Sequence, residues 1–156
     1  MPGASIRTNP VMARKPKEVD LTDKKILADR FAACLSDLRI EDIFDLLHED
    51  CAWWMVGRAD RFPMGGKRGK AEIEAFLPQV FEGFDSFEFV VDRTTEQDDR
   101  IVVEAHAVGI GPGPARYENV YAAIFRVQDG KFIEIREFYD PLEAFAYQES
   151  IPTQPA

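Results

Sequence analysis

The sequence predicts an α+β domain in which three N-terminal helices pack on a curved, mostly antiparallel sheet. Helical spacing of apolar residues is confined to the first half of the chain, whereas the alternation typical of strands dominates the second half. A chain of 156 residues is long enough to bury a sizeable core but short for two domains. Helices that precede a long meander must cover one of its faces, so a curved sheet would enclose a pocket.

Three segments carry the helical pattern. The first helix begins near Thr22 or Asp23, both suitable N-caps, and presents one apolar stripe formed by Leu27, Phe31, Cys34, Leu35 and Leu38. A second, short helix is expected over about 41–48 and a third over about 70–81. Pro78 lies inside the third helix and predicts a kink or an early end there.

The remaining segments read as strands and turns. An aromatic strand is expected over 51–57, followed by a loop over 58–69 that is rich in Arg, Gly and Pro. Alternation predicts strands over 87–92, 100–110, 116–127 and 131–139, and Asp129-Gly130 is a strong signal for a two-residue hairpin. Residues 141–147 are expected to form a closing helical turn, and residues 149–156 a short tail.

The charge distribution excludes some partners. Nineteen Lys and Arg against 28 Asp and Glu leave a net charge of −9, yet residues 1–20 carry a net +2 and show no apolar period. This segment is expected to be an arm, either disordered or lying across a partner subunit. The acidic body argues against nucleic acid as a partner, and no apolar run is long enough for a membrane span.

The cysteines and the N-terminus indicate the compartment. Cys34 and Cys51 lie in no CxxC or Cys/His cluster, so buried, reduced thiols of a cytoplasmic protein are expected, with a disulfide as the minor alternative. The N-terminus lacks the apolar core of a secretory signal. Two His and scattered carboxylates offer no ligand spacing, so neither a metal nor another cofactor is expected.

Three groups of motifs resemble the SnoaL-like branch of the nuclear transport factor 2-like superfamily. Residues 42–50 with the aromatic strand after them resemble its second helix and first strand, and residues 66–73 resemble its glycine-led third helix. The segments 117–121, 125–131 and 135–140 resemble its last strands. The resemblance spans about residues 22–148, so residues 21–148 are expected to form this domain. It implies a cone-shaped fold around an apolar cavity and a homodimer formed through the outer sheet face.

Strand parity selects the candidate catalytic residues. Glu104 and His106 are two apart on one strand and share a face, and Glu137 ends an otherwise apolar face of another. If all three face the pocket, they form a carboxylate–imidazole–carboxylate cluster suited to general acid/base work, with His106 as the proton shuttle. The alternative is that Glu104 and His106 lie on a solvated outer face.

Comparison within the superfamily bears on the same positions. The sequence is similar to limonene-epoxide hydrolases, which hold an Arg and two Asp around a nucleophilic water. The Arg matches Glu104, and the two Asp match His106 and Glu137. The Tyr and Asn that help to hold the water match Trp53 and Met55. The general-base Asp of the steroid isomerases also matches Met55, and their oxyanion-hole residues match Phe31 and Ala123. None of these three residues can do the original work, so isomerase chemistry of that kind is excluded.

The candidate binding residues come from the same alternation. Trp53 shares parity with Met55, so these two and Phe31 are expected to form an apolar wall. Tyr121 and Asn119 are expected to orient a carbonyl or hydroxyl, and Tyr139 closes the last strand beside them.

These features predict a cofactor-independent lyase, dehydratase or isomerase acting on a hydrophobic, aromatic or polyketide-like substrate. Epoxide hydrolysis in the same pocket, or a non-catalytic ligand-binding or assembly domain, is the alternative.

Overall fold

Helices and strands are largely segregated along the chain, as in an α+β fold. The computed structural model describes residues 23–153, so the arm expected over residues 1–20 lies outside the described part of the chain. The elements are α1 (Lys24–Ser36), the 3-10 helix η1 (Ile40–Leu46), β1 (Leu47–Met55), β2 (Gly66–Gly69), α2 (Lys70–Phe81), β3 (Ser86–Gln97), β4 (Arg100–Ile110), β5 (Arg116–Gln128), β6 (Lys131–Tyr139) and α3 (Pro141–Ser150).

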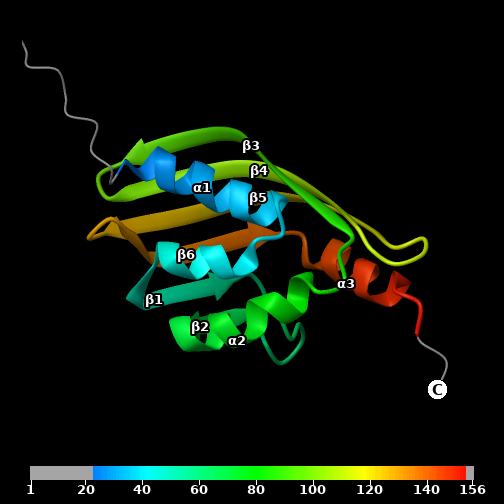
Figure 1. Ribbon diagram of the computed structural model, residues 1–156. Helices are drawn as coiled ribbons and strands as arrows, with labels where there is room; N and C mark the ends of the chain where they lie inside the picture. The colour runs from blue at the N-terminus through cyan, green and yellow to red at the C-terminus, as the bar shows by residue number, and fades with distance from the viewer. Residues whose placement is uncertain (1–22, 154–156) are drawn as a thin grey trace, which may run out of the picture.

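One six-stranded sheet forms the framework, with the strand order β2-β1-β6-β5-β4-β3. Strands β1 and β6 run parallel, and every other neighbouring pair is antiparallel. Figure 1 shows the curved sheet, with α1 and α2 lying against it and α3 at the end where β6 finishes. The predicted α+β class and the mostly antiparallel sheet are therefore confirmed.

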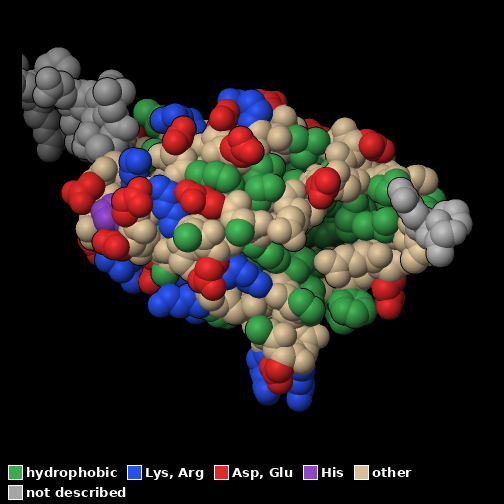
Figure 2. Space-filling view, turned by 60° about the horizontal axis from the view of Figure 1, so that its bottom comes forward, with side chains coloured by type: hydrophobic (Ala, Val, Ile, Leu, Met, Phe, Trp, Pro, Cys, Tyr) green, Lys and Arg blue, Asp and Glu red, His purple; other side chains and the backbone are tan. Residues whose placement is uncertain are grey.

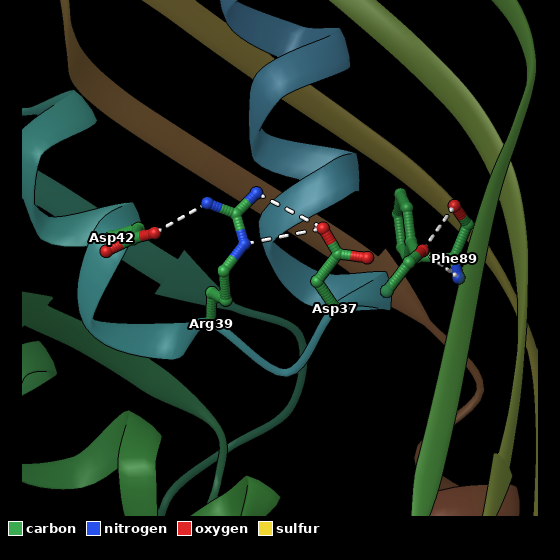
Figure 3. Close-up of polar contacts among 5 residues, drawn as sticks. Asp37, Arg39, Asp42 and Phe89 are labelled. Carbon is green, nitrogen blue, oxygen red and sulfur yellow. Dashed lines mark hydrogen bonds and ion pairs between the residues drawn. The ribbon is translucent and has the colours of Figure 1, made fainter.

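The first helix is fixed at both ends. The Asp23 carboxylate accepts a hydrogen bond of 2.8 Å from the backbone N–H of Lys25, as expected of an N-cap. At the other end, the hydroxyl of Ser36 accepts a 2.9 Å bond from the N–H of Phe89 on β3. Figure 3 shows Arg39 between Asp37 and Asp42, which ties the end of α1 to η1 at 3.2 and 2.7 Å. Of these contacts, the Ser36–Phe89 bond joins α1 to the sheet.

Several element boundaries differ from the sequence prediction. Strand β1 begins at Leu47, inside the expected second helix, because Leu47 is fully buried opposite Phe132 of β6. Strand β2 occupies part of the expected loop, since its four polar and glycine residues carry no alternation to reveal it. Helix α2 continues through Pro78 and ends at Phe81, with the N–H of Glu82 bonded to the Pro78 carbonyl.

The C-terminal helix is also longer than expected. Helix α3 runs to Ser150 and so includes the first two residues of the predicted tail. Its N-cap is Asp140, whose carboxylate accepts a 2.9 Å bond from the N–H of Leu142, with Pro141 in the first turn. The closing helical turn expected over residues 141–147 is therefore part of a longer helix.

The β5–β6 hairpin has the predicted turn and one unpredicted irregularity. Asp129 and Gly130 both have positive φ, 51° and 73°, as a type I′ turn requires. A register shift beside the turn pairs Val127 with Phe132. The shift buries Phe132 completely, whereas strict alternation with the buried Ile135 would place Ile133 on the inner face. Beyond this point the expected parity holds, and it sets the orientation of the site residues.

The two cysteines match their prediction, because Cys34 and Cys51 are both buried and free. In residues 23–153, no helix combines the length and the apolar character that crossing a membrane would need.

Candidate functional site

A cavity of about 230 Å³ lies between the concave face of the sheet and helices α1, α2 and α3. Figure 2 shows a hollow with hydrophobic side chains inside it. The lining is mostly aromatic and aliphatic, and Glu137 is the only charged residue that lines it in the described part of the chain. A small apolar molecule therefore fits this space better than a highly charged one.

Glu137 faces the cavity because its cross-strand partners lie on the inner face of the sheet. It pairs with Ala123 on β5 and with Met55 on β1, and both of these neighbours are 3% exposed on the inner face. Its Oε2 accepts a 2.9 Å hydrogen bond from Nε1 of Trp53. Burial raises the pKa of Glu137 to about 7, although the Trp53 bond opposes this shift by stabilising the charged form. Near neutral pH this carboxyl can therefore both take and give a proton.

The two adjacent tryptophans point to opposite faces of β1, as strand parity predicts. Trp53 is 2% exposed and packs on Phe31 with ring centroids 5.6 Å apart. Trp54 packs instead on Phe138 at 5.1 Å, on the other face. Trp53, Phe31 and Met55 all line the cavity, so the structure brings together the predicted apolar wall.

Hydroxyl groups form a second polar feature of the cavity. The hydroxyls of Tyr117 and Tyr121 hydrogen-bond to each other, and Nδ2 of Asn119 donates to the Tyr117 oxygen at 3.0 Å. Burial raises the pKa of Tyr117 to about 12 and that of Tyr121 well above its ordinary value. Both phenols therefore stay protonated near neutral pH. One proton serves the bond between them, so the other O–H can donate to a ligand.

Asn119 does not line the cavity, in contrast to the expectation that it contacts a substrate. It is 6% exposed, and its Oδ1 accepts from the backbone N–H groups of Val120 and Asp140 at 2.9 and 3.0 Å. Its Nδ2 donates to the Asp140 carbonyl at 2.8 Å as well as to Tyr117. Asn119 therefore orients Tyr117 and holds the start of α3.

Tyr139 lines the cavity beside Tyr121, its partner in the sheet, with ring centroids 5.6 Å apart. Its hydroxyl is buried and has no hydrogen-bond partner in the described part of the chain. Burial, reinforced by the nearby Glu137 carboxylate, raises the pKa of this phenol. A buried, unpaired donor next to an acid leaves hydrogen-bonding capacity for a ligand.

The expected cluster of Glu104, His106 and Glu137 does not form. His106 is paired with Asp92 at 2.9 Å, with its side chain 47% exposed, and Glu104 lies 3.9 Å from Arg93. Both are on the outer face, because their cross-strand neighbours are Val120 and Ala122, one step out of phase with the inward Tyr121 and Ala123. The two-residue spacing correctly placed Glu104 and His106 on one face, but it could not show which face.

Some lining residues were missed by the sequence reasoning. Tyr147 and Gln148 of α3 line the cavity, as does Met64 of the β1–β2 loop. The nitrogen Nε2 of Gln148 lies 3.6 Å from the sulfur of Met64, so these two segments meet beside the cavity. The helical turn expected over residues 141–147 includes Tyr147, but no feature of the sequence showed that this segment faces the cavity.

The side chains that commonly bind metal ions are not clustered in the described residues. In residues 23–153, no group of three or more His, Cys, Asp or Glu side chains is placed to hold a metal ion.

Comparison with known proteins defines the family. The family model of the SnoaL-like domain matches residues 28–135, so the chain belongs to this family. The curated protein UPF0523 protein C of Dictyostelium discoideum is 32% identical over 115 residues, which cover 71% of this chain and 72% of that protein.

Solved structures share the fold at low sequence identity. An NTF2-like protein of unknown function from Burkholderia pseudomallei has a TM-score of 0.70 at 16% identity, covering 82% of this chain and 97% of that one. An LEH-like epoxide hydrolase from M. tuberculosis has a TM-score of 0.62 at 20% identity, with 78% and 86% covered. IdmH, a putative polyketide cyclase from Streptomyces antibioticus, has a TM-score of 0.66 at 16% identity, with 81% and 99% covered. The suspected SnoaL-like, NTF2-like membership is thus confirmed.

Proposed function

We propose that the cavity is the active site of a cofactor-independent enzyme that moves a proton on a small, apolar, ring-containing substrate. The observation that carries this proposal is Glu137, a single carboxyl group with a pKa of about 7 in an otherwise uncharged, largely aromatic cavity. General acids and bases work best when their pKa lies near the operating pH. The epoxide hydrolase and polyketide cyclase among the structural neighbours are consistent with such a role.

The reaction class follows from the two polar features of the cavity. Glu137 removes a proton from carbon next to a carbonyl, and the electron pair moves onto the carbonyl oxygen as an enolate forms. The free O–H of the Tyr117–Tyr121 pair donates to that oxygen and stabilises the developing charge. Returning the proton from Glu137 to another carbon of a conjugated enolate gives isomerisation. Expulsion of a β-substituent by the enolate electron pair, with the proton passing from Glu137 to the leaving group, gives elimination.

Epoxide hydrolysis by two carboxylates and an Arg is less well supported. Of the three ionisable positions matched to that machinery, only Glu137 lines the cavity, and Glu104 and His106 lie on the outer face. A non-catalytic binding domain would use the same cavity without any proton transfer at Glu137. These two alternatives and the proposal therefore differ in what Glu137 does.

Hydrogen–deuterium exchange into an apolar cyclic ketone tests the proposal. The probe is 2-tetralone in deuterated buffer, with exchange at its activated carbon followed by NMR. We expect the protein to accelerate exchange with a rate that rises through about pH 7, and Glu137→Gln to lower the rate by about 10²-fold or more.

His106→Gln is the matched control, because this side chain lies outside the cavity and should leave the rate unchanged. Acceleration that survives Glu137→Gln contradicts the role of Glu137. Absence of any acceleration, with the ketone still bound, favours the non-catalytic alternative.

A further inference from the structure

Arg68 of β2 does not itself line the cavity, but it contacts two residues that do, and the proposed proton transfer does not use it. In the β1–β2 ladder it pairs with Trp53, and cross-strand partners project from the same face of a sheet. Since Trp53 lines the cavity, the ladder places Arg68 on the inner side.

The contacts of Arg68 place its charge beside two lining residues. Its guanidinium carbon is 4.1 Å from the ring centroid of Phe76, and Nη1 donates to the carbonyl of Met64 at 2.8 Å. Phe76 and Met64 both line the cavity. The charge of Arg68 also lowers the pKa of Tyr139, in opposition to the larger effect of burial. The guanidinium therefore lies next to the cavity, on the side where Met64 and Phe76 line it.

The guanidinium has hydrogen-bonding capacity left. Its partners are two neutral carbonyls, those of Met64 and Pro63 at 2.8 and 2.9 Å, and Arg68 forms no ion pair with any Asp or Glu of residues 23–153. Arginine has five N–H donors, so three remain for another acceptor.

The surrounding segment is basic, although the whole chain carries a charge of −9. Between positions 58 and 68 stand four cations, Arg58, Arg61, Lys67 and Arg68, and one anion, Asp60. Asp60 forms an ion pair with Arg58, with 2.6 Å between Oδ2 and Nη2. An anion approaching this edge of the cavity therefore meets a favourable local field in an acidic protein.

We propose that Arg68 recognises a carboxylate on the ligand, so that the cavity takes a small aromatic acid. The carboxylate would lie at the edge formed by Met64 and Phe76, and the ring would extend inward to Trp53. A guanidinium fork matches a carboxylate in geometry, and its pairing is strengthened where an aromatic ring excludes water from one side. This assignment rests on the proposed role of the cavity as a small-molecule site, and it makes Arg68 a specificity residue that takes no part in the proton transfer.

Binding of a matched pair of probes tests the assignment by isothermal titration calorimetry. The probes are 2-naphthoate and 2-naphthamide, which share ring and shape but differ in charge. The titrations are done near pH 6, where Glu137, with its pKa of about 7, is mostly protonated and does not repel the acid. We expect the acid to bind about 10-fold more tightly than the amide.

Variants separate the charge of Arg68 from its contacts with the loop. Arg68→Gln should abolish the preference for the acid and change the affinity for the amide little, whereas Arg68→Lys should keep part of the preference. Arg61→Gln is the matched control, since this exposed arginine belongs to the same segment and should leave both affinities unchanged.

The outcomes distinguish this assignment from the proposed function. Equal affinity for acid and amide, or an equal loss of both in Arg68→Gln, overturns the carboxylate assignment while the cavity remains a binding site. Failure of both probes to bind overturns the small-molecule site itself, and the carboxylate assignment with it.

Discussion

Replacing Glu137 by Gln should stabilise the protein, and the gain should depend on pH. The pKa of Glu137 is raised from an ordinary value of 4.5 to about 7 because burial disfavours its charged form. The folded chain therefore binds a proton at this site more tightly than the unfolded chain does. The stabilising contribution is fully present below about pH 4.5 and is lost as the pH rises through about 7.

The size of the effect follows from the difference between the two pKa values. Each pKa unit corresponds to about 1.4 kcal/mol, so the rise from 4.5 to about 7 corresponds to at most about 3–4 kcal/mol. Gln cannot ionise, so the Glu137→Gln variant does not have to bury a charged carboxylate at high pH. The free energy of unfolding of the variant, relative to the wild type, should therefore increase by about 2–3 kcal/mol between about pH 5 and pH 8.

Urea denaturation of both proteins at the two pH values measures this difference directly. Glu104→Gln is the matched control, because this half-exposed carboxylate lies on the outer face and should give nearly the same difference at both pH values. If the difference between Glu137→Gln and wild type is the same at pH 5 and pH 8, the reasoning about burial of Glu137 is refuted.

Three further predictions follow from single contacts. Trp53→Phe removes the N–H that stabilises the Glu137 carboxylate, so the pKa of Glu137 should rise by about 1 pH unit, as measured by carboxyl NMR titration. Asn119→Ala leaves buried backbone groups unpaired and should lower the free energy of unfolding by about 2–3 kcal/mol in urea denaturation. Gly109→Ala puts a Cβ 2.3 Å from the Phe84 ring and should lower the free energy of unfolding by about 1–3 kcal/mol.

Each of these changes has a control nearby in the chain. Trp54→Phe changes a side chain on the outer face and should leave the pKa of Glu137 unchanged. If the pKa of Glu137 stays the same or falls in Trp53→Phe, the role of the Trp53 N–H is contradicted. Val120→Ala, at a residue 68% exposed, should cost little, and an equally small effect of Asn119→Ala would contradict its bridging role. At Gly83 the nearest atom to a new Cβ, apart from the adjoining residues, is the Tyr147 hydroxyl oxygen at 3.9 Å, which is an ordinary contact. A similar loss of stability in Gly83→Ala and Gly109→Ala would therefore count against the Phe84 clash.

Much of the fold could be predicted from the sequence because periodicity is a local signal. The bounds of β4 and β6 match the alternation, and α2 spans the predicted residues despite Pro78. Strand β2 could not be predicted, because four residues without apolar alternation are recognised only by their pairing with β1. The early start of β1 at Leu47 likewise depends on its partner strand β6.

The candidate site shows what strand parity can and cannot decide. Parity relates residues of one strand, so Trp53 and Met55 share a face and Trp54 takes the other. It does not relate one strand to the next, which requires the register. The observed register aligns Glu137 with Ala123 and Val103, and this leaves Glu104 one step out of phase, on the outer face. The apolar content of a strand was therefore a better guide to its inner face than the chemistry of its polar residues.

The pKa of Glu137 in the free protein is the most direct test of the site. Carbon-13 labelling of the glutamate carboxyl groups, with the Glu137 resonance assigned by its absence from Glu137→Gln, allows that group to be titrated by NMR. A midpoint of about pH 7 is expected from its burial in the cavity. A midpoint near the ordinary value of 4.5 would show a solvated carboxylate and contradict the proposed role of Glu137 in proton transfer.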